Sequence, residues 1–345
     1  MKLVLTLLVR DEADIVDAQI AYHLSAGVDL VVATDNRSAD GTTEILERYA
    51  SEGVLHLVRE SGEDLRQSEW VTHMAQVAFV QHGADWVLNT DADEFWWPRG
   101  GSLREVLASV PAHYGVVRGA WRNFVPRPDR HPFFAERMTV RTTTPSFHPH
   151  PLSTHSKSAH RGTADVRIGR GNHEAFGLGL VPVRGWYPIE ILHFPVRSLE
   201  HCRRKYVTQF VALERNAEKG IPGHMAAAYQ AYREGRLDDF YAPLVVDDSG
   251  LDAGIAAGEY VVDIRLRDRL RTLGFDERAA AAPTPAMFEQ PDVRESAAFA
   301  GEYSALLEAD LGVALGNRVD ALEVRVGELE RGMLSRMRSA LESLR

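Results

Sequence analysis

The chain has few of the features that would assign it to several common protein classes. Cys202 is the single cysteine among 345 residues, so no intrachain disulfide or cysteine-rich metal site can form, and a reducing compartment is indicated. Net positive charge is also lacking, because the formal net charge is -10 at pH 7. Such a chain has no overall attraction to nucleic acid or to an anionic membrane, so nucleic acid is not an expected partner.

Long apolar runs are missing as well. The N-terminal apolar run from residue 3 to residue 9 stops at Arg10, Asp11 and Glu12. It is too short for a membrane-spanning helix, and it lacks the small-residue cleavage site of a signal peptide. The sequence therefore predicts a first β-strand here, no integral membrane segment, and a cytoplasmic location.

The first hundred residues alternate strand and helix patterns. Apolar runs predict strands at residues 2–9, 29–34, 54–58 and 85–88, and helical patterns predict helices at 14–25, 42–51 and 68–82. Strands that are apolar throughout are typical of a sheet buried on both faces. The βαβαβαβ order indicates an α/β fold, with a mostly parallel sheet flanked by helices.

Composition divides the remainder of the chain. Residues 111–200 lose helical periodicity and are rich in Pro, His, Arg and Thr, which favours short strands and loops suited to an acceptor site. Helical patterns return over 201–285, and in 286–345 a linker precedes apolar residues spaced by three and four. We predict a domain over 1–200 with halves 1–110 and 111–200, then a helical extension, then the linker and tail. The tail is either a coiled coil that forms a homo-oligomer or a helix packed on its own domain.

The strongest chemical signal is an acidic turn after the fourth predicted strand. The apolar run that begins at Trp86 ends in Asp91 and Asp93, at the carboxyl edge where α/β sheets bind ligands. Two carboxylates one residue apart suit Mn²⁺ or Mg²⁺, which also binds diphosphate oxygens. A divalent cation can neutralise the charge that builds on a nucleoside diphosphate when a sugar leaves it. Acidic turns are common at strand ends, so the context has to support this interpretation.

Three motifs in order supply that context. They are LLVRDE at residues 7–12, DNRSADGT at residues 35–42 and DADEF at residues 91–95, each after a predicted strand. Together they resemble the nucleotide-binding half of family-2-type glycosyltransferases, although that family usually has Asn-Glu where this chain has Asp11-Glu12. The resemblance covers residues 1–120 well, 121–210 thinly, and nothing beyond.

The resemblance implies a GT-A-like fold and an activity. The chain would be a metal-dependent, hexosyltransferase-like glycosyltransferase that uses Mn²⁺ or Mg²⁺. It would move a sugar from a nucleoside-diphosphate sugar, with a UDP-sugar favoured, to a hydroxyl of a glycan or glycoside. Inversion at the anomeric carbon is the expected outcome.

The resemblance also implies roles for residues around the nucleotide. Asp35 would contact the base or ribose, and Glu12 would shape the same pocket. Asp35 can also close a hydrogen-bonded turn, and the two roles are compatible. Arg66 and Gln67 precede the third predicted helix, where they either approach the nucleotide or form a solvated helix start. Asp91 would contact the donor as well as the metal.

Further residues would complete the metal and diphosphate site. His193 ends an apolar strand, so it is either a packed core histidine or the ligand that joins Asp91 and Asp93 on the metal. Arg197 and Lys205 follow at a helix start, a place suited to anions, and would lie near the diphosphate.

An inverting transfer needs a general base for the acceptor hydroxyl, whereas a retaining transfer needs none. Glu174 lies in a Gly-rich loop before His193 and is the first candidate, with Asp165 second and His173 third. The alternative is that these carboxylates pair with nearby arginines.

Other His and Trp residues invite simpler interpretations. The spacing of the histidines in the middle segment fits no closed zinc site, so they are expected to be polar loop residues; they are His148, His150, His155 and His160. Trp96, Trp97 and Trp121 either form a stacking face for a sugar ring or, in the case of the first two, pack beneath the acidic turn.

Two other functions compete with a glycosyltransferase. A nucleotidyltransferase of sugar-nucleotide synthesis would also have a parallel sheet and an acidic turn, but it normally carries a Gly-rich phosphate loop after the first strand. The run 10–12 contains no glycine. A non-catalytic sugar-nucleotide-binding scaffold is opposed by the intact Asp35, Asp91 and Asp93.

Overall fold

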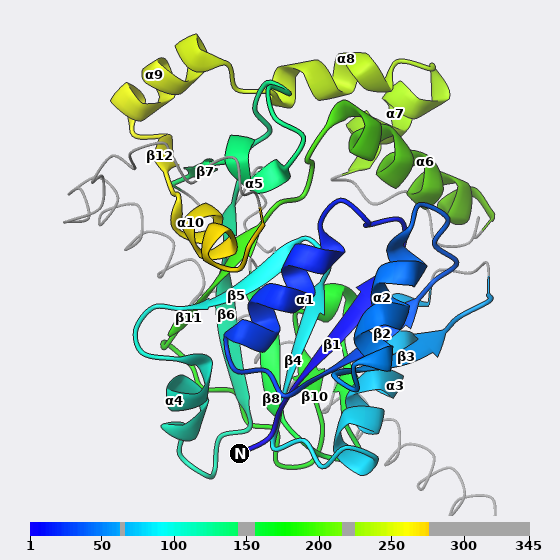
Figure 1. Cartoon of the computed structure of the whole chain (residues 1–345), viewed down its shortest axis with the longest axis vertical. Helices are drawn as coiled ribbons and strands as arrows, with labels where there is room; N and C mark the ends of the chain where they lie inside the picture. The colour runs from blue at the N-terminus through cyan, green and yellow to red at the C-terminus, as the bar shows by residue number, and fades with distance from the viewer. Residues whose placement is uncertain (63–65, 144–155, 216–224, 276–345) are drawn as a thin grey trace, which may run out of the picture.

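The computed structural model describes residues 1–62, 66–143, 156–215 and 225–275, and it shows an α/β architecture (Figure 1). The strands of its main sheet are β1 (Leu3–Val9), β2 (Leu30–Asp35), β3 (Leu55–Arg59), β4 (Trp86–Asp91), β5 (Glu94–Pro98), β6 (Val116–Asn123), β8 (Ser156–Arg161) and β11 (Ile189–His193). Their order across the sheet is β3-β2-β1-β4-β8-β6-β11-β5. The first four are parallel, β8 is antiparallel to both of its neighbours, and β11 is parallel to β6 but antiparallel to β5.

The predicted elements of the first hundred residues are all present. The helices between the first four strands are α1 (Val16–Ser25), α2 (Thr42–Ser51) and α3 (Gln67–Val80). The predicted ends differ from these bounds by at most three residues. The predicted α/β fold with a mostly parallel sheet flanked by helices is therefore confirmed.

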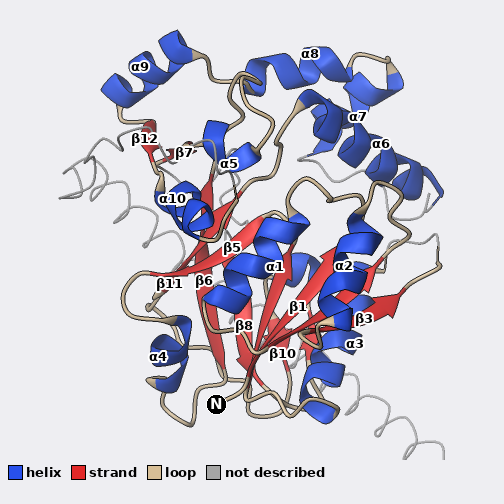
Figure 2. Ribbon diagram, in the orientation of Figure 1, coloured by secondary structure: helices blue, strands red, loops and turns tan. Residues whose placement is uncertain are grey.

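Alternation along β1 explains why both faces of the sheet are covered. Leu3, Leu5 and Leu7 pack in the core that contains residues of α1 and α2, while Val4 packs in a second core with Met74 of α3. Successive side chains of a strand point to opposite faces, so an entirely apolar strand needs a helix layer on each side. Figure 2 shows α1 and α2 crossing one face of the sheet.

The chain after β5 also contributes short strands and most of the helices. These elements are α4 (Leu103–Ala108), α5 (Phe134–Arg137), β7 (Val140–Thr142), β9 (Arg167–Ile168), the 3-10 turn η1 (Arg170–Asn172), β10 (Ala175–Phe176), α6 (Leu199–Arg215), α7 (Ala226–Arg233), α8 (Leu237–Tyr241), the 3-10 turn η4 (Ala242–Leu244), α9 (Asp248–Ala257), β12 (Tyr260–Val262) and α10 (Arg265–Thr272). Helices α6 to α9 form the top of the molecule in Figure 1.

The predicted helical extension is joined to the sheet domain by packing and pairing. Strand β12 pairs antiparallel with β7, and Leu266 and Leu270 of α10 lie in the same core as β1. The domain boundaries themselves stay predictions. The predicted linker and coiled-coil tail, 286–345, lie outside the described residues, as do His148, His150 and His155. None of the helices described here is long and apolar enough to span a membrane.

Buried ion pairs strengthen that junction. Glu190 of β11 accepts hydrogen bonds from Arg122 Nε at 2.8 Å and Arg265 Nη1 at 2.7 Å. Asp263 accepts from Arg265 Nη2 at 2.6 Å and Arg141 Nε at 2.9 Å. Burial opposes ionisation of both carboxylates, yet these arginines lower the pKa of Glu190 and of Asp263 to about 2. The charges therefore tie β12 and α10 to the sheet at neutral pH.

Candidate functional site

A cavity of about 460 Å³ lies at the carboxyl ends of β1 and β4. The side chains that line it include Arg10, Glu12, Gln67, Asp91, Asp93, Glu94, Trp121, Lys157, His173, His193, Arg204 and Lys205. They come from the end of β1, the acidic turn, the start of α3, strands β6, β8 and β11, the segment after η1, and α6. The cavity therefore lies at the sheet edge where the sequence predicts ligand binding.

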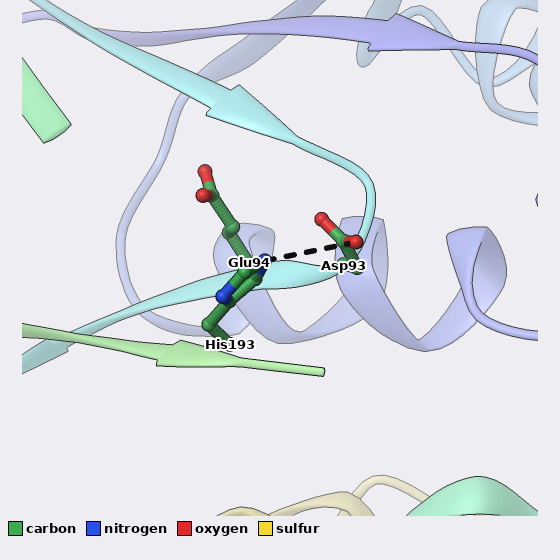
Figure 3. Close-up of side chains that lie close together, drawn as sticks. All are labelled: Asp93, Glu94 and His193. Atoms are coloured by element: carbon green, nitrogen blue, oxygen red, sulfur yellow. Dashed lines mark ion pairs between the residues drawn. The ribbon is translucent and has the colours of Figure 1, made fainter. Parts of the chain in front are cut away.

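Strand pairing brings His193 to the acidic turn. The chain reverses after Asp91, so Glu94 opens β5 and pairs with His193 at the end of β11. As a result, Asp93 Oδ2 lies 3.8 Å from His193 Nε2 (Figure 3). Asp93, Glu94 and His193 each offer a ligand atom, and these atoms lie within 4.8 Å of one another.

His193 is held in a state that can bind a cation. Its Nδ1 donates to Asn123 Oδ1 at 2.7 Å, so the proton lies on Nδ1 and the lone pair is on Nε2, toward Asp93. Burial lowers the pKa of His193 to about 4, so the ring is neutral at pH 7. A neutral imidazole beside a carboxylate is a donor set that Mn²⁺ or Mg²⁺ accepts, so these residues fit the predicted metal.

Asp93 is ionised and paired with Lys205. Lys205 Nζ donates to Asp93 Oδ2 at 2.8 Å and to Pro195 O at 2.9 Å. Burial opposes ionisation of Asp93, but the Lys205 ammonium holds the pKa of its carboxyl below the usual range. The Lys205 side chain is 25% exposed and lines the cavity, so its ammonium can also meet an anion there.

Asp91 faces other partners. Its Oδ2 lies 2.6 Å from Lys157 Nζ, and its Oδ1 accepts from Asn172 Nδ2 at 3.1 Å and from Gln67 Nε2 at 3.4 Å. Lys157 comes from β8, and its side chain is 1% exposed. The predicted metal trio is thus divided, because Asp93 and His193 lie together while Asp91 pairs with a buried lysine.

Glu94 and Lys157 are residues to which the sequence analysis gave no role. Glu94 accepts hydrogen bonds from Trp121 Nε1 and from the Asp91 backbone N–H, both at 3.1 Å, and lies 3.1 Å from Lys157 Nζ. Burial, together with the charges of Asp91 and Asp93, raises the pKa of Glu94 to about 8. Its position in the DADEF run was a signal for Glu94. No comparable signal marked Lys157.

Arg197 lies beneath the cavity and does not line it. The guanidinium is fully buried, donates to both oxygens of Asp14 at 2.7 Å, and also contacts Glu12. Burial opposes ionisation of Asp14, but Arg197 lowers its pKa to about 2. Arg197 thereby joins the connection after β1 to the connection before α6. Within the described chain, Arg204 of α6 is a cation that lines the cavity instead.

The residues that were predicted to contact the nucleotide do not all line the same cavity. Asp35 is buried and does not line the cavity, because its Oδ1 accepts from the Ser38 N–H at 3.0 Å and its Oδ2 accepts from Thr43 Oγ1 at 2.5 Å. Arg66 lines a second cavity of about 510 Å³. Trp70 lines both cavities, so the two spaces adjoin.

Among the predicted bases, His173 alone lines the cavity. His173 Nδ1 lies 2.7 Å from Ser156 O, and its ring meets that of Trp121 edge-on at 5.5 Å between centroids. Glu174 is half-buried outside the cavity lining. Asp165 is exposed and accepts hydrogen bonds from the Thr163 hydroxyl and from the Leu178 N–H, which follows β10.

The structure also gives the positions of the three tryptophans and of His160. Trp121 lines the cavity and stacks on His193 with ring centroids 4.6 Å apart. Trp96 is fully buried and Trp97 stacks on Tyr22 of α1, and neither lines the cavity. The expectation that His160 is a polar loop residue is wrong: it lies buried on β8, where burial lowers its pKa to about 4.

Comparison with known proteins gives distant structural likenesses. No family model and no curated protein matches the chain. S. aureus TarS 1–349 in complex with UDP is 15% identical over 60% of this chain and 65% of that chain, with a TM-score of 0.33. In complex with UDP-GlcNAc it is 12% identical over 92% of each chain, with a TM-score of 0.36. The chain thus spans less than two thirds of the first of these structures.

A second solved structure comes from another organism. Glucosyl-3-phosphoglycerate synthase from Mycobacterium tuberculosis, in complex with Mn²⁺, UDP and glucosyl-3-phosphoglycerate, is 15% identical over 64% of this chain and 81% of that chain. Its TM-score is 0.30.

The chain's own sheet defines the class of fold. Parallel strands β3-β2-β1-β4 lead into the acidic turn, and antiparallel β8 separates them from a second group of strands that returns His193 to that turn. This arrangement is a GT-A-like α/β fold, as predicted.

Proposed function

We propose that this protein is a glycosyltransferase that moves a sugar from a nucleoside-diphosphate sugar to a hydroxyl of a glycan or glycoside. The observation that carries the proposal is a single cavity at the carboxyl edge of the sheet, where carboxylates, a neutral histidine and cations meet. A cavity of about 460 Å³ is in the size range of small-molecule sites. We keep the UDP-sugar as the favoured donor.

Asp93 and His193 would hold the divalent cation in this proposal. The carboxylate is ionised, and the imidazole is neutral with its lone pair turned toward that carboxylate. When bound, Mn²⁺ or Mg²⁺ supplies positive charge next to the leaving diphosphate. Glu94 lies in the same group, and its raised pKa allows it to act as a hydrogen-bond donor there.

Lys205 and Arg204 would bind the diphosphate. Both lie in the second turn of α6, where their side chains line the cavity. Arg204 is 29% exposed, and its distances to the carboxylates of Asp14 and Asp40 are 3.8 Å, so it can turn to a ligand. The role proposed for Arg197 is to fix α6 under these cations through Glu12 and Asp14.

The nucleotide would extend along the end of β1 toward the second cavity. Glu12 and Gln67 line the first cavity, and Arg66 lines the second. Asp35 would act through the turn that it closes, because its oxygens bind Ser38 and Thr43. Trp121 would stack against a sugar ring beside His193.

The nucleotide proposal is tested by thermal unfolding of the full chain with UDP, GDP or dTDP, each with and without Mn²⁺. We expect one nucleotide, UDP, to raise the unfolding temperature in the presence of Mn²⁺. A ligand at about a hundred times its Kd stabilises by about 2.7 kcal/mol, which amounts to several degrees. The absence of a shift with every nucleotide, in both conditions, would reject the proposal.

Inversion at the anomeric carbon would require a general base for the acceptor hydroxyl. The positions of the candidate bases relative to the cavity change their order. His173 lines the cavity, and with its proton on Nδ1 the Nε2 atom is the proton-accepting nitrogen. We expect His173→Gln to lower kcat for transfer by roughly a hundredfold. Glu174→Gln and Asp165→Asn should each change it by less than about threefold.

Transfer rates of the three variants, with UDP affinity measured alongside, decide between the candidates. A loss of kcat in Glu174→Gln alone would make Glu174 the general base, as the sequence predicts. A product of retained anomeric configuration, seen by NMR of the first-formed glycoside, would remove the need for any of the three bases.

A further inference from the structure

The two aspartates of the acidic turn differ in what holds them. Both oxygens of Asp91 accept hydrogen bonds, Oδ2 from Lys157 and Oδ1 from Asn172 and Gln67. Asp93 is bound through Oδ2 to Lys205. A pattern of two alternating carboxylates suggests two equivalent ligands, but the packing around them is not equivalent.

Lys157 cannot withdraw from Asp91. It lies on β8, which is paired on one side with β4 and on the other with β6. Its side chain is 1% exposed, and the ammonium also lies 3.1 Å from Glu94 Oε1 and 5.6 Å from the centroid of the Trp121 ring. Moving this charge away from Asp91 would leave it unpaired inside the protein, which is strongly unfavourable.

Lys205, in contrast, can leave Asp93. It lies on α6 at the rim of the cavity, a quarter of its side chain is exposed, and a lysine has a long flexible stem. A ligand cation can therefore replace the Lys205 ammonium at Asp93 while that ammonium moves to the bound anion.

We propose that Lys157 is a positioning residue that stays paired with Asp91 as an internal counter-cation. Asp91 is then not a metal ligand, and Asp93 and His193 bind the divalent cation. The inference rests on the proposed function and refines its metal site. A divalent cation at Asp91 Oδ2 would share that oxygen with the Lys157 ammonium, and two positive charges on one oxygen repel each other. Asp91 then keeps a fixed orientation toward the cavity without being a metal ligand.

The test is calorimetric titration of Mn²⁺ into the full chain in the presence of UDP. Asp93→Asn is expected to weaken Mn²⁺ binding by at least about a hundredfold, whereas Asp91→Asn should change it by less than about threefold. Lys157→Met removes the internal cation at similar length and releases Asp91. That variant should bind Mn²⁺ about tenfold more tightly, a gain that a merely structural role for Lys157 would not produce.

A paired variant protects the test against misfolding. Lys157→Met/Asp91→Asn removes both charges of the pair, so it avoids an unpaired buried carboxylate, and it should bind Mn²⁺ within about threefold of the wild type. Equal losses in Asp91→Asn and Asp93→Asn would overturn the proposal. So would unchanged Mn²⁺ affinity in folded Lys157→Met, or a loss of about a hundredfold in the paired variant.

The wild-type titration separates this inference from the proposed function. A wild type that binds UDP and Mn²⁺, but depends on Asp91 as strongly as on Asp93, would contradict the role of Lys157 alone. A wild type that binds UDP without any Mn²⁺ uptake would contradict the inference and leave nucleotide binding intact. A chain that does not bind UDP at all would contradict the proposed function, and the inference with it.

Discussion

Replacing Asp93 with Asn is expected to lower kcat/KM for sugar transfer by roughly a thousandfold, about 4 kcal/mol of transition-state stabilisation. The substitution preserves volume, removes the anion that faces His193, and leaves Lys205 without its charged partner. Affinity for Mn²⁺ and Mn²⁺-dependent affinity for UDP should be lost together. Initial-rate kinetics and calorimetry on the same preparation measure the two effects.

The control for Asp93→Asn is Asp17→Asn. Asp17 is a partly exposed carboxylate on α1 that pairs with Arg48, away from the cavity. It should keep wild-type kinetics and metal affinity. If Asp93→Asn retains Mn²⁺-dependent UDP binding and remains folded, the metal site has been assigned to the wrong residues.

Replacing Arg197 with Met is expected to produce the largest loss of stability, about 3 kcal/mol in the free energy of unfolding. The change leaves Glu12 and Asp14 without the guanidinium that they share. We use the lower end of the usual range because the Asp14 side chain remains 39% exposed, and water screens its charge. Urea unfolding monitored by circular dichroism measures the loss, and Arg203→Met, an exposed arginine of α6 paired with Asp238, is the matched control.

The loss of stability caused by Arg197→Met is predicted to depend on pH. The pKa of Asp14 is lowered in the folded state to about 2, so this carboxylate contributes stability that is present above its unfolded pKa of about 3.8. That contribution is lost as the pH falls through about 2. The difference in free energy of unfolding between wild type and Arg197→Met should therefore be constant from pH 7 to pH 5 and should become smaller below pH 4. A gap that widens on acidification would contradict the assigned pairing.

The first half of the fold was predictable from local pattern. Strands such as β1 are apolar throughout because helices cover both faces of the sheet, and α1 and α2 alternate with them at short spacing. These signals act within about fifteen residues, which is the range that periodicity can detect. The acidic turn at Asp91 and Asp93 could be predicted for the same reason, because it directly follows a strand.

The residues that the sequence did not reveal depend on strand order. Lys157 meets Asp91 only because β8 enters the sheet between β4 and β6. Arg197 meets Asp14 across 183 positions of sequence, so its pairing with that carboxylate could not be read from its place at a helix start. His160 was interpreted as a loop residue because residues 111–200 are rich in Pro, His, Arg and Thr, yet 156–161 forms a buried strand in which Lys157 pairs with Asp91 and Ser158 donates to the His173 carbonyl.

The most direct test of the account is release of UDP by the full chain. The chain is incubated with a panel of UDP-sugars, a mixture of acceptor glycosides and Mn²⁺, and parallel reactions contain EDTA or the Asp93→Asn variant. A second assay supplies UTP with sugar 1-phosphates and measures pyrophosphate. We predict UDP release from at least one donor, lost with EDTA and with Asp93→Asn, and no pyrophosphate. Pyrophosphate release without UDP release would identify a nucleotidyltransferase, and UDP binding with neither product would identify a non-catalytic scaffold; either result contradicts the proposed activity.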